Sequence, residues 1–227
     1  MAWKTRYGSL AVHIYRVLID PLLWSLRPKI VRICQELGAR DVLDIATATG
    51  AQCRALGRAG IDATGLDLAE AMIAAAKRRG GTNARYVRGS AYELPFPDGS
   101  FDASLLLLAL HEHREDERSL MIREALRVLR LDGTLILADY TKPTNPAFHV
   151  PWQIIWLVEK VAGVEHSAGF RDFVARGGLE GLTERQGLTV GGMTSSHFGT
   201  IGIVTVRRGS MPRAKPAGRA QSRMPPD

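Results

Sequence analysis

Residues Asp44 to Asp67 read DIATATGAQCRALGRAGIDATGLD. Apolar residues at 42, 43 and 45 predict a buried strand, and the small residues 46–50 end it in a tight turn. A helix and a second strand follow, and the second strand ends at the carboxylate of Asp67. In α/β folds this order holds a nucleoside, with backbone amides near the ligand and the acid on the ribose hydroxyls. We therefore expect the chain to bind an adenosine-bearing cofactor.

The first turn indicates which kind of cofactor this is. Dinucleotide sites use G-x-G-x-x-G to accept a pyrophosphate, but Ala46 and Ala48 occupy the first two glycine positions here. Asp44, two residues before the turn, is an anion that can face an ammonium group. The chain also lacks the Tyr-x-x-x-Lys pair that protonates a carbonyl, which argues against a nicotinamide-dependent dehydrogenase. The pattern favours a cofactor with a cationic amino-acid part.

Four motifs in register resemble those of class I S-adenosylmethionine-dependent methyltransferases, in the type 11 subfamily that includes quinone C-methyltransferases. Residues 42–50 resemble V-L-D-x-G-x-G-x-G, and residues 65–72 resemble G-x-D-x-S-x-x-M. Residues 89–96, with Phe101-Asp102, resemble G-D-A-x-x-L-P-F…F-D, and residues 124–134 resemble E-x-x-R-V-L-K-P-G-G. Together these motifs cover residues 40 to 140.

The resemblance implies a fold and a domain plan. The fold is α/β, a Rossmann-like three-layer sandwich whose mostly parallel seven-stranded sheet has an antiparallel last strand and a helical lid. Residues 1–40 would form N-terminal helices over the cofactor, and residues 41–208 the methyltransferase domain, with a lid inserted at about 145–185. Residues 209–227 would form a basic disordered tail.

The resemblance also implies how S-adenosylmethionine is held. Asp44 would orient the methionine ammonium, the turn 46–50 would lie along the methionine chain, and Asp67 would hold the ribose. Ser90 and Ala91 would touch the adenine. The complete set of expected cofactor contacts is Asp44, Ala46, Thr47, Ala48, Gly50, Asp67, Leu68, Met72, Ser90, Ala91 and Leu107.

Three of these contacts depart from the family pattern. Ala46 and Ala48 stand in place of glycine, so a positive φ there would cost roughly 1–2 kcal/mol each. Ser90 replaces an aspartate, and a neutral hydrogen bond contributes about 0.5–1.5 kcal/mol, roughly half of a charged one. The departures predict weakened cofactor binding.

Composition and charge restrict the classes of function. A length of 227 residues with 45% apolar content suits one α/β domain. The net charge is +7, but four of the basic residues lie in the tail, so much of the basicity is outside the folded part. No N-P-P-Y tetrapeptide, which is typical of enzymes that methylate nucleic-acid bases, follows the fourth strand. Neither feature favours nucleic acid as a partner. Two isolated cysteines predict no metal site and a reduced, cytoplasmic protein. The longest apolar run is too short for a membrane span, and oligomeric state is not indicated.

The periodicity predicts an alternating order of elements and hence a parallel sheet. Helices are expected at 8–19, 21–37, 69–79 and 115–130, and strands at 84–89, 102–109 and 133–139. A helix at 150–164 and another at 169–187 follow, and 188–195 with 200–207 form a closing hairpin.

Methyl transfer from a sulfonium is an in-line displacement, so alignment of donor and acceptor matters most. A base is needed only where the acceptor loses a proton. His111, after the fourth strand, is the candidate base, or else it caps the strand or bonds a loop. Tyr140, after the fifth strand, would orient an acceptor or pack under the lid. We expect a methyltransferase acting on a small, partly apolar metabolite. The alternative is a weak or inactive nucleoside-binding module, RNA-associated through its basic tail.

Overall fold

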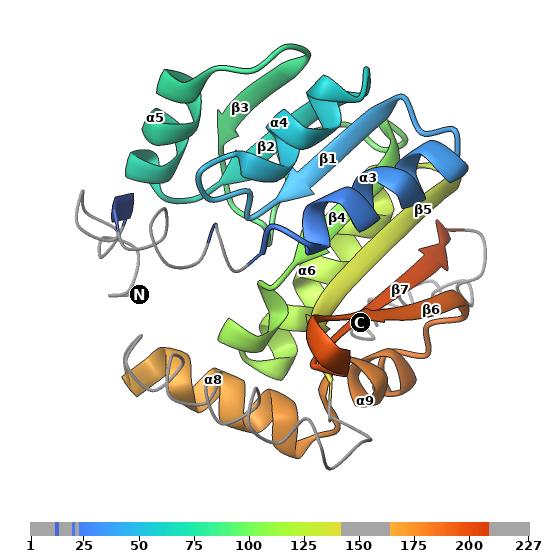
Figure 1. The fold of residues 1–227 in the computed structure, drawn as a ribbon. Coiled ribbons are helices and arrows are strands. Elements are labelled where there is room, and N and C mark those ends of the chain that lie inside the picture. The colour runs from blue at the N-terminus through green and yellow to red at the C-terminus, as the bar shows by residue number, and fades with distance from the viewer. Residues whose placement is uncertain (1–11, 14–19, 21–22, 142–163, 209–227) are drawn as a thin grey trace, which may run out of the picture.

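The computed structural model describes residues 12–13, 20, 23–141 and 164–208 (Figure 1). The expected helix at 8–19, the lid residues 145–163 and the tail 209–227 lie wholly or mostly outside these ranges. Within them the chain forms one sheet with helices on both of its faces.

The sheet has seven strands in the order β3-β2-β1-β4-β5-β7-β6. Neighbouring strands from β3 to β5 run parallel, and β7 runs antiparallel to both β5 and β6. The expected mostly parallel seven-stranded sheet with a reversed last strand is therefore confirmed. The strand bounds are β1 Asp41–Ile45, β2 Asp62–Asp67, β3 Ala84–Arg88, β4 Phe101–Leu107, β5 Leu129–Tyr140, β6 Val190–Ser196 and β7 Ile201–Arg207.

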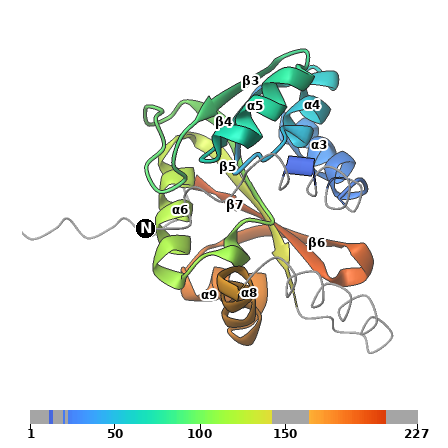
Figure 2. The same ribbon diagram turned by 90° about the vertical axis from the view of Figure 1, so that its left-hand side faces the viewer.

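Helices cover the sheet as two layers with separate apolar cores (Figures 1 and 2). α3 (Leu26–Glu36), α4 (Ala51–Arg58) and α5 (Glu70–Arg79) pack on one face. α6 (Glu115–Arg127), α8 (Val164–Ala175) and α9 (Gly178–Arg185) pack on the other. Alternate strand residues supply the two cores, because successive side chains point to opposite faces. Leu43 and Ile45 belong to the α6 side, and Val42 belongs to the α3 side.

Four expected boundaries were wrong. The helix expected at 21–37 begins at Leu26, after a turn. The helix expected at 115–130 ends at Arg127, and β5 begins at Leu129 rather than 133 because Leu129 pairs with Phe101. The strand expected at 102–109 ends at Leu107, since the next residue turns into the left-handed region at φ +53°.

The single helix expected at 169–187 is two helices, α8 and α9. Gly177 at φ +96° and Gly178 at φ +62° break it, in a conformation that favours glycine. A Cβ on Gly178 would lie 2.6 Å from the carbonyl oxygen of Tyr140. The break therefore lets α9 approach the end of β5.

Candidate functional site

In the turn after β1, every second residue from 46 to 50 has left-handed backbone. Ala46 has φ +59°, Ala48 has φ +48° and Gly50 has φ +72°. The strain anticipated at the two alanines is therefore present. Left-handed backbone in non-glycine residues costs about 1–2 kcal/mol each and concentrates at functional sites.

Two glycines let this turn lie close to its neighbours. A Cβ on Gly65 of β2 would lie 2.8 Å from Cγ2 of Thr47, and a Cβ on Gly50 would lie 2.5 Å from Cε1 of Tyr86. The Thr47 amide also donates to the Leu66 carbonyl at 2.9 Å. The turn is thus held against β2 by contacts that a larger residue would prevent.

Asp67 ends β2 beside this turn. Its Oδ2 accepts the Ala48 amide at 2.9 Å, and its Oδ1 accepts the Ala69 amide at 2.8 Å. Burial raises the pKa of Asp67, and these backbone N–H donors oppose that shift. Each carboxylate oxygen has a further lone pair, so the carboxylate can still accept bonds from a pair of neighbouring hydroxyls.

Asp44 is buried beneath the turn, with 3% of its surface exposed. Its Oδ2 accepts the Thr47 hydroxyl at 2.5 Å and the Cys53 thiol at 3.6 Å. Burial raises the pKa of Asp44 to about 6, against the opposing hydrogen bond from Thr47. The contact of this carboxylate with an ammonium group stays a prediction.

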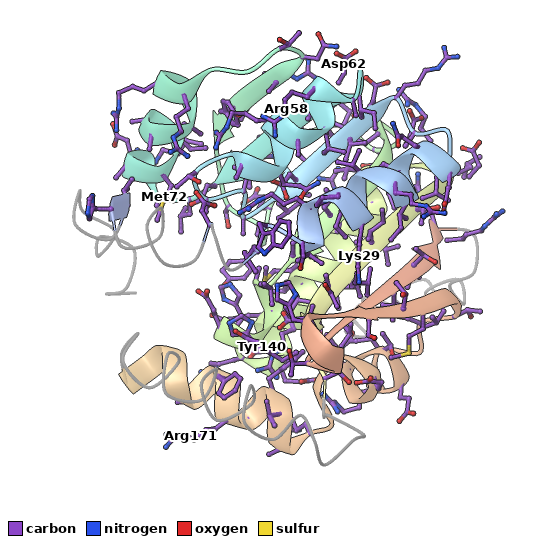
Figure 3. The ribbon with its side chains drawn as sticks, in the orientation of Figure 1. Lys29, Arg58, Asp62, Met72, Tyr140 and Arg171 are labelled. Carbon is purple, nitrogen blue, oxygen red and sulfur yellow. The ribbon has the colours of Figure 1, made fainter. Side chains whose placement is uncertain are left out.

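Residues from the N-terminal part of the chain reach the same turn. Asp20 is buried and accepts the Thr49 hydroxyl at 2.8 Å, while Arg27 donates to Asp20 at 2.7 Å. Val12 joins Ala48, Met72 and Ala75 in a small buried cluster. The start of α5, where Figure 3 labels Met72, is thereby packed onto the turn.

The remaining expected contacts follow neighbouring strands at the same edge of the sheet. Ser90 and Ala91 come after β3, and the Ser90 hydroxyl oxygen accepts the Tyr92 amide at 3.2 Å. Leu68 follows β2 and Leu107 ends β4, and both are partly buried. Because β1 to β4 are parallel, their carboxyl ends meet here. The structure brings the whole expected set to one edge.

His111 and Asp139 form a buried pair at the ends of β4 and β5. His111 lies in the short helix η3 (Leu110–Glu112) and is 3% exposed, and Asp139 is fully buried. Nδ1 of His111 lies 2.8 Å from Oδ1 of Asp139, whose Oδ2 accepts the backbone amides of Leu110 and His111. A carboxylate can only accept, so it fixes the proton on Nδ1 and leaves Nε2 as the acceptor nitrogen.

Aromatic rings surround this histidine. Its ring centroid lies 4.7 Å from that of Tyr140 and 6.2 Å from that of Phe170, and the Tyr140 and Phe170 rings lie 5.2 Å apart. Tyr140, labelled in Figure 3 beside α8, is partly buried. Tyr140 therefore packs against His111 and Phe170, and its role toward an acceptor stays a prediction.

Sequence reasoning missed the residue that joins these elements. Arg118 of α6 is fully buried, and its guanidinium donates to the Leu110 carbonyl at 2.9 Å and the Gly169 carbonyl at 3.0 Å. It also pairs with Glu115 and with Asp172 of α8. The helical spacing offered a signal, because Arg118 shares a face with Met121, Ile122 and Ala125.

A second histidine lies nearby. Nδ1 of His113 lies 2.8 Å from the Tyr92 hydroxyl. Burial lowers the pKa of His113 to about 4, so its imidazole is neutral near pH 7. Among the residues that the structure describes, no group of three or more His, Cys, Asp or Glu side chains is placed to hold a metal ion, and no helix is long and apolar enough to cross a membrane.

Comparison with known proteins agrees with this geometry. Residues 43–137 match the family profile described as a methyltransferase domain. A demethylmenaquinone methyltransferase from Thermotoga maritima is 33% identical over 135 residues, which are 59% of this chain and 58% of that protein. One from Clavibacter sepedonicus is 28% identical over 207 residues, or 87% of this chain and 81% of that protein. The chain spans only 41–60% of the length of four such relatives.

Solved structures share the fold. The magnesium protoporphyrin IX methyltransferase of Synechocystis, crystallised with bound SAH, superposes with a TM-score of 0.55 over 81% of this chain and 82% of that one, at 22% identity. The strand order, the four motifs and the profile match agree: residues 43–137 are similar to a methyltransferase domain, and the described part of the chain has the fold that these solved methyltransferases share.

Proposed function

We propose that this protein transfers a methyl group from S-adenosylmethionine to a small, partly apolar acceptor. The observation that carries the proposal is the Asp67 carboxylate, held by the Ala48 and Ala69 amides beside a left-handed turn. A carboxylate fixed in this way suits a ribose, and the close turn suits a ligand that approaches the backbone. The relatives named as methyltransferases support the same reading.

The residues present fit the cofactor in chemical type. Asp67 would accept bonds from both ribose hydroxyls, and Asp44 would balance the ammonium group once its carboxylate is ionised. Ala46 to Gly50 would line the methionine chain, and Met72, Leu68, Ser90, Ala91 and Leu107 would surround the nucleoside. When bound, the cofactor supplies a methyl group on a positively charged sulfur, open to in-line attack.

His111 would serve an acceptor that must lose a proton. Asp139 holds Nδ1 of His111 at 2.8 Å, so Nε2 is the basic nitrogen and the carboxylate stabilises the imidazolium that forms. Tyr140 and Phe170 pack around the His111 ring, and aromatic side chains in this arrangement would suit a flat apolar acceptor. Since several relatives act on a demethylated menaquinone by name, a reduced quinone with a ring hydroxyl is the first acceptor to test.

Calorimetric titration with S-adenosylmethionine tests the cofactor half of the proposal. Asp67→Ala removes two charge-assisted hydrogen bonds to the ribose, each contributing about 1.5–3 kcal/mol, so affinity should fall at least about 100-fold. Asp62→Ala is the matched control, because Asp62 is an exposed carboxylate at the opposite end of β2. Its affinity should equal that of the unmodified protein.

Two outcomes would contradict the proposal. Tight binding retained by folded Asp67→Ala protein would mean that the carboxylate holds no ribose. Absence of binding by the unmodified protein at high micromolar cofactor would instead favour an inactive nucleoside-binding module. Incubation with methyl-labelled donor and a fractionated cell extract, followed by mass analysis of the labelled product, identifies the acceptor.

A further inference from the structure

The two helical layers of the sheet carry opposite charge. α3, α4 and α5 together contain eight Lys and Arg side chains and two Glu side chains, a net charge of +6. On the other face, α6 and α9 contain six carboxylates and four guanidinium groups, a net charge of −2. The positive charge of the folded part is therefore concentrated on one side of the molecule.

Most of these cations face solvent. The exposed ones are Lys29, Arg32, Arg58, Lys77, Arg78 and Arg79. Figure 3 shows Lys29 and Arg58 on the α3 and α4 side, and Arg171 on α8 away from them. Arg32 pairs with Glu36, and Arg79 approaches Asp20 at 3.8 Å. Within the described part of the chain no carboxylate forms an ion pair with Arg58, Lys77 or Arg78.

A shallow groove lies within this basic layer, between α3 and α4. Its volume is about 430 Å³, and Trp24, Arg27, Pro28, Val31, Ala55 and Arg58 line it. Trp24 is 73% exposed, an unusual state for an indole. An exposed tryptophan among cations is typical of protein surfaces that lie at a membrane interface, where the ring sits at headgroup level and the cations meet lipid phosphates.

We propose that the α3–α4–α5 layer docks on the surface of a bilayer that contains anionic lipid, with Trp24 inserted at headgroup level and Arg58 on lipid phosphate. Charge complementarity selects this occupant: the helices of this layer carry a net charge of +6, or +5 with the Asp20 carboxylate that meets Arg27 and Arg79, and are attracted to a negative surface. The exposed indole adds an apolar contact at headgroup level, and RNA, whose bases can stack on an indole, is tested below as the competing occupant. The inference is independent of the proposed methyl transfer.

Co-sedimentation of the full chain with vesicles tests the docking. The protein should sediment with vesicles of phosphatidylcholine mixed with phosphatidylglycerol, should stay in solution with phosphatidylcholine alone, and should be released by salt. Arg58→Glu changes two charge units at about 1 kcal/mol each, so binding should weaken roughly 30-fold. Trp24→Ala should also weaken it.

Arg123→Glu is the matched control, because Arg123 is an exposed arginine on α6 in the acidic layer. It makes the same charge change and should leave vesicle binding within about twofold. Circular dichroism of each variant verifies the fold. The proposal is overturned if the unmodified protein does not bind anionic vesicles, if Arg58→Glu and Arg123→Glu weaken binding equally, or if an RNA oligonucleotide displaces the vesicles. Cofactor titration of the same samples reports the methyltransferase site separately.

Discussion

Replacement of Arg118 by methionine should destabilise the protein although it removes a buried charge. The Arg118 side chain is 0% exposed, and its guanidinium contacts two carbonyls and two carboxylates on α6, η3 and α8. Methionine keeps much of the apolar volume, including packing near the Phe173 ring, whose centroid lies 5.0 Å from Cζ of Arg118. The hydrogen bonds are what the substitution removes.

The size of this loss in stability depends on which hydrogen-bond partners of Arg118 water cannot solvate once the arginine is removed. Glu115 and Asp172 keep side-chain exposures of 28% and 40%, so both can be solvated once the arginine is gone. The Leu110 carbonyl keeps the His113 amide at 3.2 Å, but it and the Gly169 carbonyl each lose one charge-assisted hydrogen bond, at about 1.5–3 kcal/mol each. We expect a loss of about 3 kcal/mol in unfolding free energy and a fall of about 6–12 °C in Tm.

Urea and thermal denaturation followed by circular dichroism measure this loss. Arg123→Met on the same helix is the control, and as an exposed substitution it should change the free energy by less than about 0.5 kcal/mol. In some proteins, apolar groups replace buried ion pairs without loss of stability. A cost below about 1 kcal/mol for Arg118→Met would therefore refute the reasoning from the two carbonyls.

Further predictions concern pH and the first turn. The native pKa of Asp44, about 6, exceeds its ordinary 3.8, so its contribution to stability falls as pH rises between those values. The native pKa of His113, about 4, lies below its ordinary 6.5, so its contribution to stability is lost as pH falls from 6.5 to about 4. Measured by urea denaturation relative to the unmodified protein, the unfolding free energy of Asp44→Asn should rise by about 3 kcal/mol from pH 3.8 to 6. That of His113→Gln should fall by about as much from pH 4 to 6.5. A variant whose stability depends on pH as that of the unmodified protein does would contradict the assignment of its residue. Gly50→Ala should cost about 2–4 kcal/mol, because its Cβ would lie 2.5 Å from Tyr86 and φ is +72°. Gly60→Ala is the control, because Gly60 also has a positive φ of +80° but nothing lies within 4 Å of its Cβ. It should show only the cost of left-handed backbone, and equal costs for the two variants would exclude a steric clash with Tyr86.

The turn after β1 and the place of Asp67 beside it were predictable from sequence because their determinants are local. The turn after β1 and the carboxylate of Asp67 carry short signals of residue type and spacing, whereas the reversed last strand was expected from the family resemblance. The acceptor side depends on contacts between distant elements. Phe170 meets His111 of η3, and the Gly169 carbonyl meets Arg118 of α6, only through tertiary packing across more than 50 residues of chain.

Two errors have the same physical origin. The break at Gly177 lies in a segment with helical spacing, and the approach of α9 to the Tyr140 carbonyl selects left-handed backbone there. Arg118 resembles a solvated charge in a polar helix, whereas its partners on α8 make burial possible. The local sequence pattern indicates periodicity, but it does not indicate which distant residues pack against a given position.

The antiparallel pairing of β5 with β7 makes the order of synthesis important for this chain. Residues 134–140 pair with residues 201–207, so one edge of β5 stays open until the ribosome has added more than 60 residues. A nascent chain that stalls after Tyr140 presents the apolar strand Leu135–Ala138 as an unpaired template for other strands. Truncated products of this protein should therefore aggregate during translation, while the full-length chain closes its own edge.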